Sequence, residues 1–158
     1  MPKVKPHVDP EQIAELRQKN VGRLFQRAHR DFNNRAIEKL RTRGHTELTL
    51  AHTTLLANLD IEGTRITTLA ERGGVTKQAM GQLVLELEQR GYVARTADAA
   101  DARATRVTFT EAGWEFLRDA YEIKLEIDAA YTAILGERRM QSLRSILNML
   151  LEGGEAVE

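Results

Sequence analysis

Apolar residues recur at helical spacing from the first turn of the chain onward. Asp9 can accept a hydrogen bond from a free backbone N–H of a helix, and Pro10 suits the first helical position. The apolar period of 3.6 residues behind them continues to about Arg43, and Gly44 can end a helix there. The pattern predicts one long helix over 9–43, which needs other apolar surface to lie against.

The middle of the chain predicts three shorter helices and then a β-hairpin. Threonines that can cap a helix stand ahead of the helices, and glycines stand near their ends. Two segments behind the last of these helices alternate apolar and polar residues, as strands do. The expected elements are a helix capped by Thr49 and ending near Gly63, an extended piece over 64–66, a short helix over 69–72 capped by Thr67 or Thr68, a helix over about 76–90 capped by Thr76, and a hairpin over about 92–109.

Two further helices are expected behind the hairpin. The first begins at Thr110-Glu111 and ends at Gly136, and the second ends before Gly153. The expected fold is therefore mainly α, with a small β-hairpin between helices. The first of these helices carries one predicted stripe: Trp114, Leu117, Tyr121, Leu125, Asp128 and Tyr131.

The segment between the third and fourth expected helices has the spacing of a helix-turn-helix. Ala70 precedes Gly74 by four positions, and the apolar Val75 follows at once. Two helices that cross closely need a small residue at the crossing and a residue that tolerates positive φ in the turn. Met80 and Leu83 then supply the buried face of the second helix. Taken alone, this spacing fits a DNA-binding motif and an ordinary helical hairpin equally well.

The exposed face of the helix over 76–90 favours DNA. A helix N-terminus carries free N–H groups that suit phosphate, and glutamine and lysine can hydrogen-bond base edges in the major groove. Gly81 inside a helix costs roughly 1 kcal/mol relative to alanine, which indicates either close approach to a DNA backbone or tolerance at an exposed site. The residues expected to contact DNA are Thr76, Lys77, Gln78, Gly81 and Gln82 of this helix, together with Thr67 and Thr68 at the start of the short helix before it.

The hairpin supplies a second candidate contact. A hairpin tip behind a recognition helix can reach the minor groove, where arginine is attracted to narrow stretches. Its alternative role is local, because Asp101 and Arg103 can pair with each other at the surface. The tip itself, 97–100, carries one charge. The residues expected to contact DNA from the hairpin are Arg95, Asp101, Arg103 and Arg106.

Composition excludes several kinds of chemistry. The 158 residues include no cysteine, which excludes disulfides, cysteine-bound zinc and thiol redox sensing. The net charge is zero, yet Met1 to Arg43 holds eleven basic and five acidic residues, and Thr110 to Glu158 holds five and ten. Such polarity can orient a partner. There is no apolar run of about 20 residues and no signal peptide, so we expect a soluble cytoplasmic protein without a membrane partner.

An enzyme and a metal sensor are the rival classes. Gly73-Gly74 lacks the lysine and hydroxyl of a phosphate-binding loop, and no nucleophile elbow occurs, so no catalytic residue and no cofactor is expected. His45, Glu47 and His52 match no standard metal-ligand spacing, so no metal site is expected. A winged-helix module that binds protein instead of DNA is the other alternative.

The chain resembles the MarR family of transcriptional regulators over about residues 48–117. The resemblance lies in 65–72, in 75–93, and most specifically in Asp101-Ala102-Arg103 followed by 107–113. It implies a winged helix-turn-helix DNA-binding domain over 48–110 and a helical dimerisation domain from 9–43 and 111–152.

The same resemblance implies how such a protein works. It implies a homodimer on an inverted-repeat operator, acting as a repressor that a small-molecule effector releases. Thr76, Lys77, Gln78 and Gln82 then face the major groove and Arg103 the minor groove. The residues expected around an effector cavity are His45, His52, Phe32 and Trp114.

Overall fold

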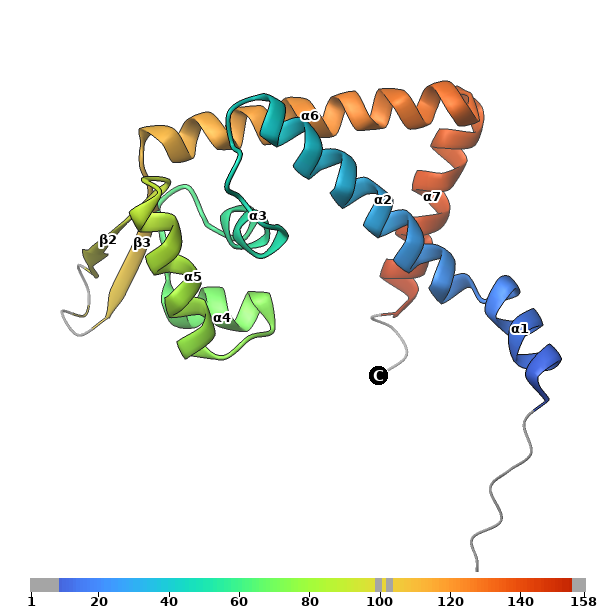
Figure 1. Ribbon diagram of the computed structural model, residues 1–158, viewed down its shortest axis with the longest axis horizontal. Coiled ribbons are helices and arrows are strands. Elements are labelled where there is room, and N and C mark those ends of the chain that lie inside the picture. The colour runs from blue at the N-terminus through green and yellow to red at the C-terminus, as the bar shows by residue number, and fades with distance from the viewer. Residues whose placement is uncertain (1–8, 99–100, 102–103, 155–158) are drawn as a thin grey trace, which may run out of the picture. The chain divides into compact units, whose positions relative to one another are not determined.

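The computed structural model describes residues 9–98, 101 and 104–154 (Figure 1). Helices predominate, with one small antiparallel sheet of strand order β1-β3-β2. The mainly helical fold class expected from the sequence is confirmed. The elements are α1 (Pro10–Lys19), α2 (Val21–Thr42), α3 (Leu50–Ala57), β1 (Thr64–Arg65), α4 (Ile66–Gly73), α5 (Lys77–Gln89), β2 (Val93–Ala97), β3 (Thr105–Phe109), α6 (Glu111–Leu135) and α7 (Glu137–Gly154).

The expected single helix over 9–43 is wrong, because it is two helices that break at Asn20. The Asn20 side-chain oxygen accepts a hydrogen bond from the backbone N–H of Arg23 at 3.2 Å and so starts α2 afresh. At the other end of α1, the carboxylate of Asp9 accepts from the N–H of Glu11 at 3.0 Å, as predicted. The chain falls into two compact units that divide between Arg35 and Ala36, and each is described by itself.

The core of the second unit lies between α3, α4, α5 and the sheet. The antiparallel register pairs Arg95 with Val107 and Arg65 with Arg106, which joins the hairpin to β1. Leucine and valine side chains from all these elements are removed from water, which supplies the main stabilising term. The most deeply buried are Leu48, Leu55, Leu56, Leu69, Val84, Leu87, Val93 and Val107.

The predicted threonine caps are confirmed at three helices and wrong at one. Thr49, Thr76 and Thr110 each accept a backbone N–H at the start of α3, α5 and α6. The fourth helix instead begins directly after β1, so Thr67 and Thr68 lie inside it. The strand sets this start, because β1 ends at the residue before α4 and no side chain caps the helix.

The members of the stripe predicted for α6 are exposed or half-buried in the single chain. Trp114 and Tyr121 are exposed, whereas Phe116, Ile123 and Ile127 are buried. The N-terminal end of α6 packs closely on the chain before β2: a Cβ at position 113 would lie 2.1 Å from the carbonyl oxygen of Tyr92. The close packing at this point therefore requires glycine.

The last helix keeps most of its apolar residues in solvent. Met140 is its one buried residue among those the structure describes, while Leu143, Ile146, Met149, Leu150 and Leu151 are exposed. A single chain therefore leaves a large apolar surface uncovered, which is unusual for a monomer. None of the helices formed by the described residues is long and apolar enough to cross a membrane.

Candidate nucleic-acid interface

The helix α5 is fixed in the domain by its apolar side. Met80, Val84 and Leu87 are buried, against α3 and α4 among others. Ala70 is buried in α4, four residues before the turn glycine Gly74, whose φ of 61° is left-handed. The small residue and the glycine thus lie as the helix-turn-helix spacing predicts, and α5 presents its opposite side to solvent.

The exposed side of α5 carries the predicted reading residues. Lys77, Gln78 and Gln82 are exposed, and Lys77 makes no ion pair with any residue that the structure describes. The hydroxyl of Thr76 accepts the N–H of Ala79 at 3.2 Å, so it caps the helix and keeps its own proton for another acceptor. This surface offers hydrogen-bond donors, one cation and a helix N-terminus to a polyanion.

The glycine of this helix has open space in front of it. A Cβ built at Gly81 meets no heavy atom within 4 Å, so the fold does not require glycine there. Both interpretations offered by the sequence, close approach of a ligand backbone and simple tolerance, are compatible with this geometry.

The start of α5, the start of α4 and the turn end of the hairpin line one hollow of about 310 Å³. Lys77 lines it from α5, Thr67 from α4, and Asp101 and Thr105 from the hairpin. Thr68, the neighbour of Thr67, is half-buried. Three predicted site residues from three elements therefore meet at one surface depression.

The turn end of the hairpin is held by a buried carboxylate that sequence reasoning missed. Asp98 is 4 % exposed and accepts from Arg65 Nε at 2.9 Å, Arg65 Nη2 at 3.2 Å and Arg106 Nη2 at 3.3 Å. Arg106 also donates to the carbonyl of Gly63 at 2.7 Å. The hydrogen bonds that Arg65 donates to Asp98 raise the pKa of Arg65. Arg106, which the sequence predicts as a DNA contact, thus also braces the hairpin.

Arg95 is also held by the protein. Its guanidinium lies 2.6 Å from the carboxylate of Glu88 on α5, and that hydrogen bond lowers the pKa of Glu88. Arg95 can reach a phosphate only by leaving this partner. Asp101 is exposed, its N–H donates to the carbonyl of Asp98, and Arg103 lies outside the described residues.

The two histidines expected at an effector cavity are buried in separate hydrogen-bonded clusters. His45 bonds the hydroxyl of Tyr92 at 2.8 Å and the carboxylate of Asp119 at 3.0 Å. His52 bonds the N–H of Thr49 at 3.2 Å and the carboxylate of Glu86 at 2.9 Å.

The two other residues expected at that cavity have different surroundings. Trp114 is exposed and its ring lies 5.2 Å from that of Phe109. Phe32 is half-buried in the first unit. Within the described part of the chain, no group of three or more histidines or carboxylates is arranged to hold a metal ion.

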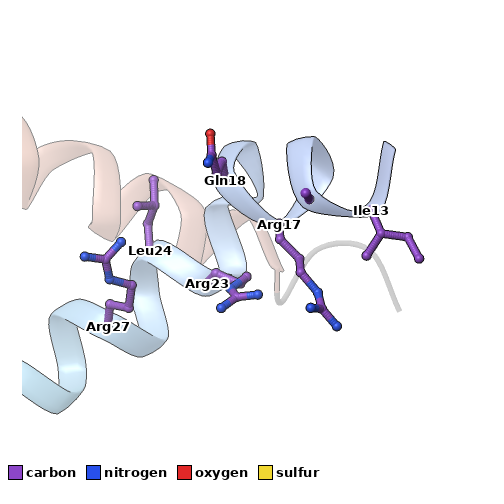
Figure 2. A pocket seen from close by; sticks show the side chains of 7 residues that line it. Ile13, Arg17, Gln18, Arg23, Leu24 and Arg27 are labelled. Carbon is purple, nitrogen blue, oxygen red and sulfur yellow. The ribbon is translucent and has the colours of Figure 1, made fainter. Parts of the chain in front are cut away.

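In the first unit, several of the basic residues of the N-terminal segment lie around one hollow. A hollow of about 390 Å³ is lined by Arg17 of α1 and by Arg23 and Arg27 of α2, with no acidic side chain among its lining residues. Figure 2 shows these arginines, with Leu24 and Gln18, along its wall. The excess of basic residues that the sequence shows in its N-terminal part is thus carried here by exposed arginines.

Comparison with known proteins finds similarity to one family of regulators. Residues 46–104 match the model of the MarR family. Transcriptional regulator Tm0710 from Thermotoga maritima is 26 % identical, with a TM-score of 0.63 over 86 % of this chain and 94 % of its own. A MarR transcriptional regulator from Methanosarcina mazei Go1 is 21 % identical, with a TM-score of 0.71 over 87 % and 98 %.

A third relative was solved with a nucleic acid. It is a variant of MepR from Staphylococcus aureus bound to an oligodeoxyribonucleotide, 20 % identical, with a TM-score of 0.59 over 85 % of this chain and 97 % of its own. Comparison with curated protein sequences found no match.

Proposed function

The chain has the fold of MarR-family transcriptional regulators and matches that family in residues 46–104, and from this premise we propose that it binds DNA sequence-specifically to regulate transcription. The exposed side of α5 is the observation that carries the proposal. Lys77, Gln78 and Gln82 stand there in solvent, next to the helix N-terminus, while the buried side holds the helix in place. Such groups bond base edges and phosphates in a major groove.

A homodimer on an inverted repeat is the proposed form. The exposed apolar residues of α6 and α7 support it, because a second copy can cover the same surface on its partner. Two α5 helices related by a twofold axis would enter successive major grooves about 34 Å apart. The helical domain from 9–43 and 111–152 is the dimerisation domain in this proposal.

Repression and release by a small molecule complete the proposal. A repressor needs two states with different spacing of the reading helices, and an effector that favours one of them. An effector that enters near His45 or His52 has to replace hydrogen bonds that these buried side chains already make. No catalysis is part of the proposal, and the site of action is the cytoplasm, where the operator lies.

A winged-helix module that binds protein is the second candidate. Its reading face would be apolar or acidic, whereas the exposed face of α5 is polar and basic at Lys77. Titration of a random duplex in low and moderate salt separates the two, because release of counterions makes phosphate binding fall steeply as salt rises. We expect binding in low salt that weakens with salt. No binding in low salt would overturn the DNA-binding proposal.

A further inference from the structure

A buried histidine of α3 is linked to an exposed glutamine of the recognition helix through one carboxylate. Glu86 Oε2 lies 2.9 Å from His52 Nε2, and Glu86 Oε1 lies 3.1 Å from Gln82 Nε2. His52 is 2 % exposed, Glu86 is one-third exposed and Gln82 is exposed. The three side chains lead from the core to the surface that faces DNA in the proposed function.

The backbone fixes which nitrogen of His52 carries the proton. His52 is the third residue of α3, and its Nδ1 receives the backbone N–H of Thr49 at 3.2 Å in a capping box. A backbone N–H can only donate, so Nδ1 is the acceptor and the proton of the neutral ring is on Nε2. His52 therefore donates to Glu86.

The ionised carboxylate in turn fixes the orientation of the Gln82 amide. The hydrogen bond from Gln82, and next that from His52, lower the pKa of Glu86, so it is ionised at neutral pH. A carboxylate accepts and does not donate, so the amide nitrogen of Gln82 must face it. The amide oxygen, Oε1, consequently faces away from Glu86.

We propose that the relay His52–Glu86–Gln82 sets the base preference of the recognition helix by presenting the Gln82 oxygen to the groove. This inference rests on the proposed DNA-binding function. In the major groove an oxygen acceptor pairs with the amino group of adenine or cytosine. His52 and Glu86 are positioning residues, since they act on the base pair through Gln82 and do not reach it themselves.

Glu86→Gln is the most informative substitution because it keeps the size of the side chain and replaces one accepting carboxylate oxygen with a donating amide nitrogen. The new amide oxygen accepts from His52, so its amide nitrogen turns toward Gln82. Gln82 then has to accept with Oε1 and presents its amide nitrogen to the groove. That donor pairs with an acceptor atom, which is O6 or N7 of guanine, O4 of thymine or N7 of adenine. At one position of each half-site cytosine, which offers only a donor, is therefore lost, and guanine and thymine are gained.

The experiment selects bound duplexes from a random pool with full-length wild type, Glu86→Gln, Gln82→Ala and the double variant. We expect Glu86→Gln to change the preference at one position, Gln82→Ala to lose preference there, and the double variant to match Gln82→Ala. The control Glu115→Gln removes the same charge from an exposed position of α6, outside the recognition helix, so it should leave base preference unchanged.

The outcomes separate the relay from the function it rests on. No binding by the wild type contradicts the proposed function. Selective binding by the wild type with the same preference in Glu86→Gln, or a change that persists in the Gln82→Ala background, overturns the relay alone. His52→Phe, checked for folding by circular dichroism, should broaden the preference at that same position. An unchanged preference in folded His52→Phe would remove the histidine from the relay.

Discussion

At the scale of single residues, the basic side chains near the interface differ in whether they form an ion pair with a carboxylate of the described chain. Arg65 and Arg106 form ion pairs with Asp98, and Arg95 forms one with Glu88. Each arginine must break its ion pair before it can contact a phosphate. Lys77 has no such partner among the described residues. Lys77 is therefore the side chain best placed to contribute charge to DNA binding.

Lys77→Ala should weaken binding to every duplex by a similar factor. A phosphate contact carries no sequence information, and its loss removes about one unit from the slope of log affinity against log salt. Fluorescence anisotropy at several salt concentrations measures both quantities. Lys124→Ala, an exposed lysine of α6, is the matched control and should change neither. An equal salt slope in Lys77→Ala and wild type would contradict the assignment.

Asp98→Ala should destabilise the winged-helix domain by about 1 to 3 kcal/mol. Removing a buried carboxylate leaves two arginines without their partner, and their partial exposure reduces the cost below that of a fully buried pair. Asp128→Ala, which breaks an exposed pair with Arg144, should cost under about 1 kcal/mol. Urea denaturation compares the two, and equal losses would mean that Asp98 does not brace the hairpin.

At the scale of elements, the sequence predicted most helices and missed what depends on contacts far along the chain. The Thr76 cap and the Ala70–Gly74 turn follow from local chemistry, and the structure confirms them. The break at Asn20 was also local, since asparagine is a strong cap, but the apolar period across it concealed the break.

The candidate site was less predictable than the elements. Asp98 is 33 residues from Arg65 in sequence, so no spacing rule reveals the pair. The buried side of α6, with Phe116, Ile123 and Ile127, was not singled out from the sequence either. The close contact of Gly113 with Tyr92 was equally hidden, because it joins the start of α6 to the residue before β2.

Basic residues at the end of α2 form ion pairs with carboxylates of α6, and these pairs predict a loss of stability in acid. Hydrogen bonds lower the pKa of Glu126, chiefly through Lys39, and they lower that of Asp119 through His45 and Arg43 against an opposing effect of burial. These carboxyls have ordinary pKa values near 4 in the unfolded chain. Their contribution is therefore full above about pH 4 to 5 and is lost as pH falls through the lower folded values.

Urea midpoints between pH 7 and pH 3 measure this effect. We expect a plateau near neutral pH and a decline below about pH 4.5, with a shallower decline in Arg43→Ala, which has already lost part of the network. Wild type and Arg43→Ala with parallel acid profiles would contradict the role of this cluster.

At the scale of the whole molecule, the exposed apolar residues of α7 predict a dimer that a charge can break. Ile146→Asp places a carboxylate in the surface that a second copy would cover. We expect light scattering to show a shift toward monomer, together with a loss of operator affinity of at least tenfold. Ser145→Asp, on the same exposed helix, is the matched control. A dimeric Ile146→Asp protein would place the interface elsewhere.

The most direct test of a dimer that reads two half-sites is the spacing of those half-sites. Five base pairs inserted at the centre of the selected operator turn the second major groove to the opposite side of the duplex, since one turn is about 10 base pairs. The account predicts that affinity falls to the level of random DNA, while a ten-base-pair insertion retains more of it. Equal affinity for the original and the five-base-pair duplex would contradict it.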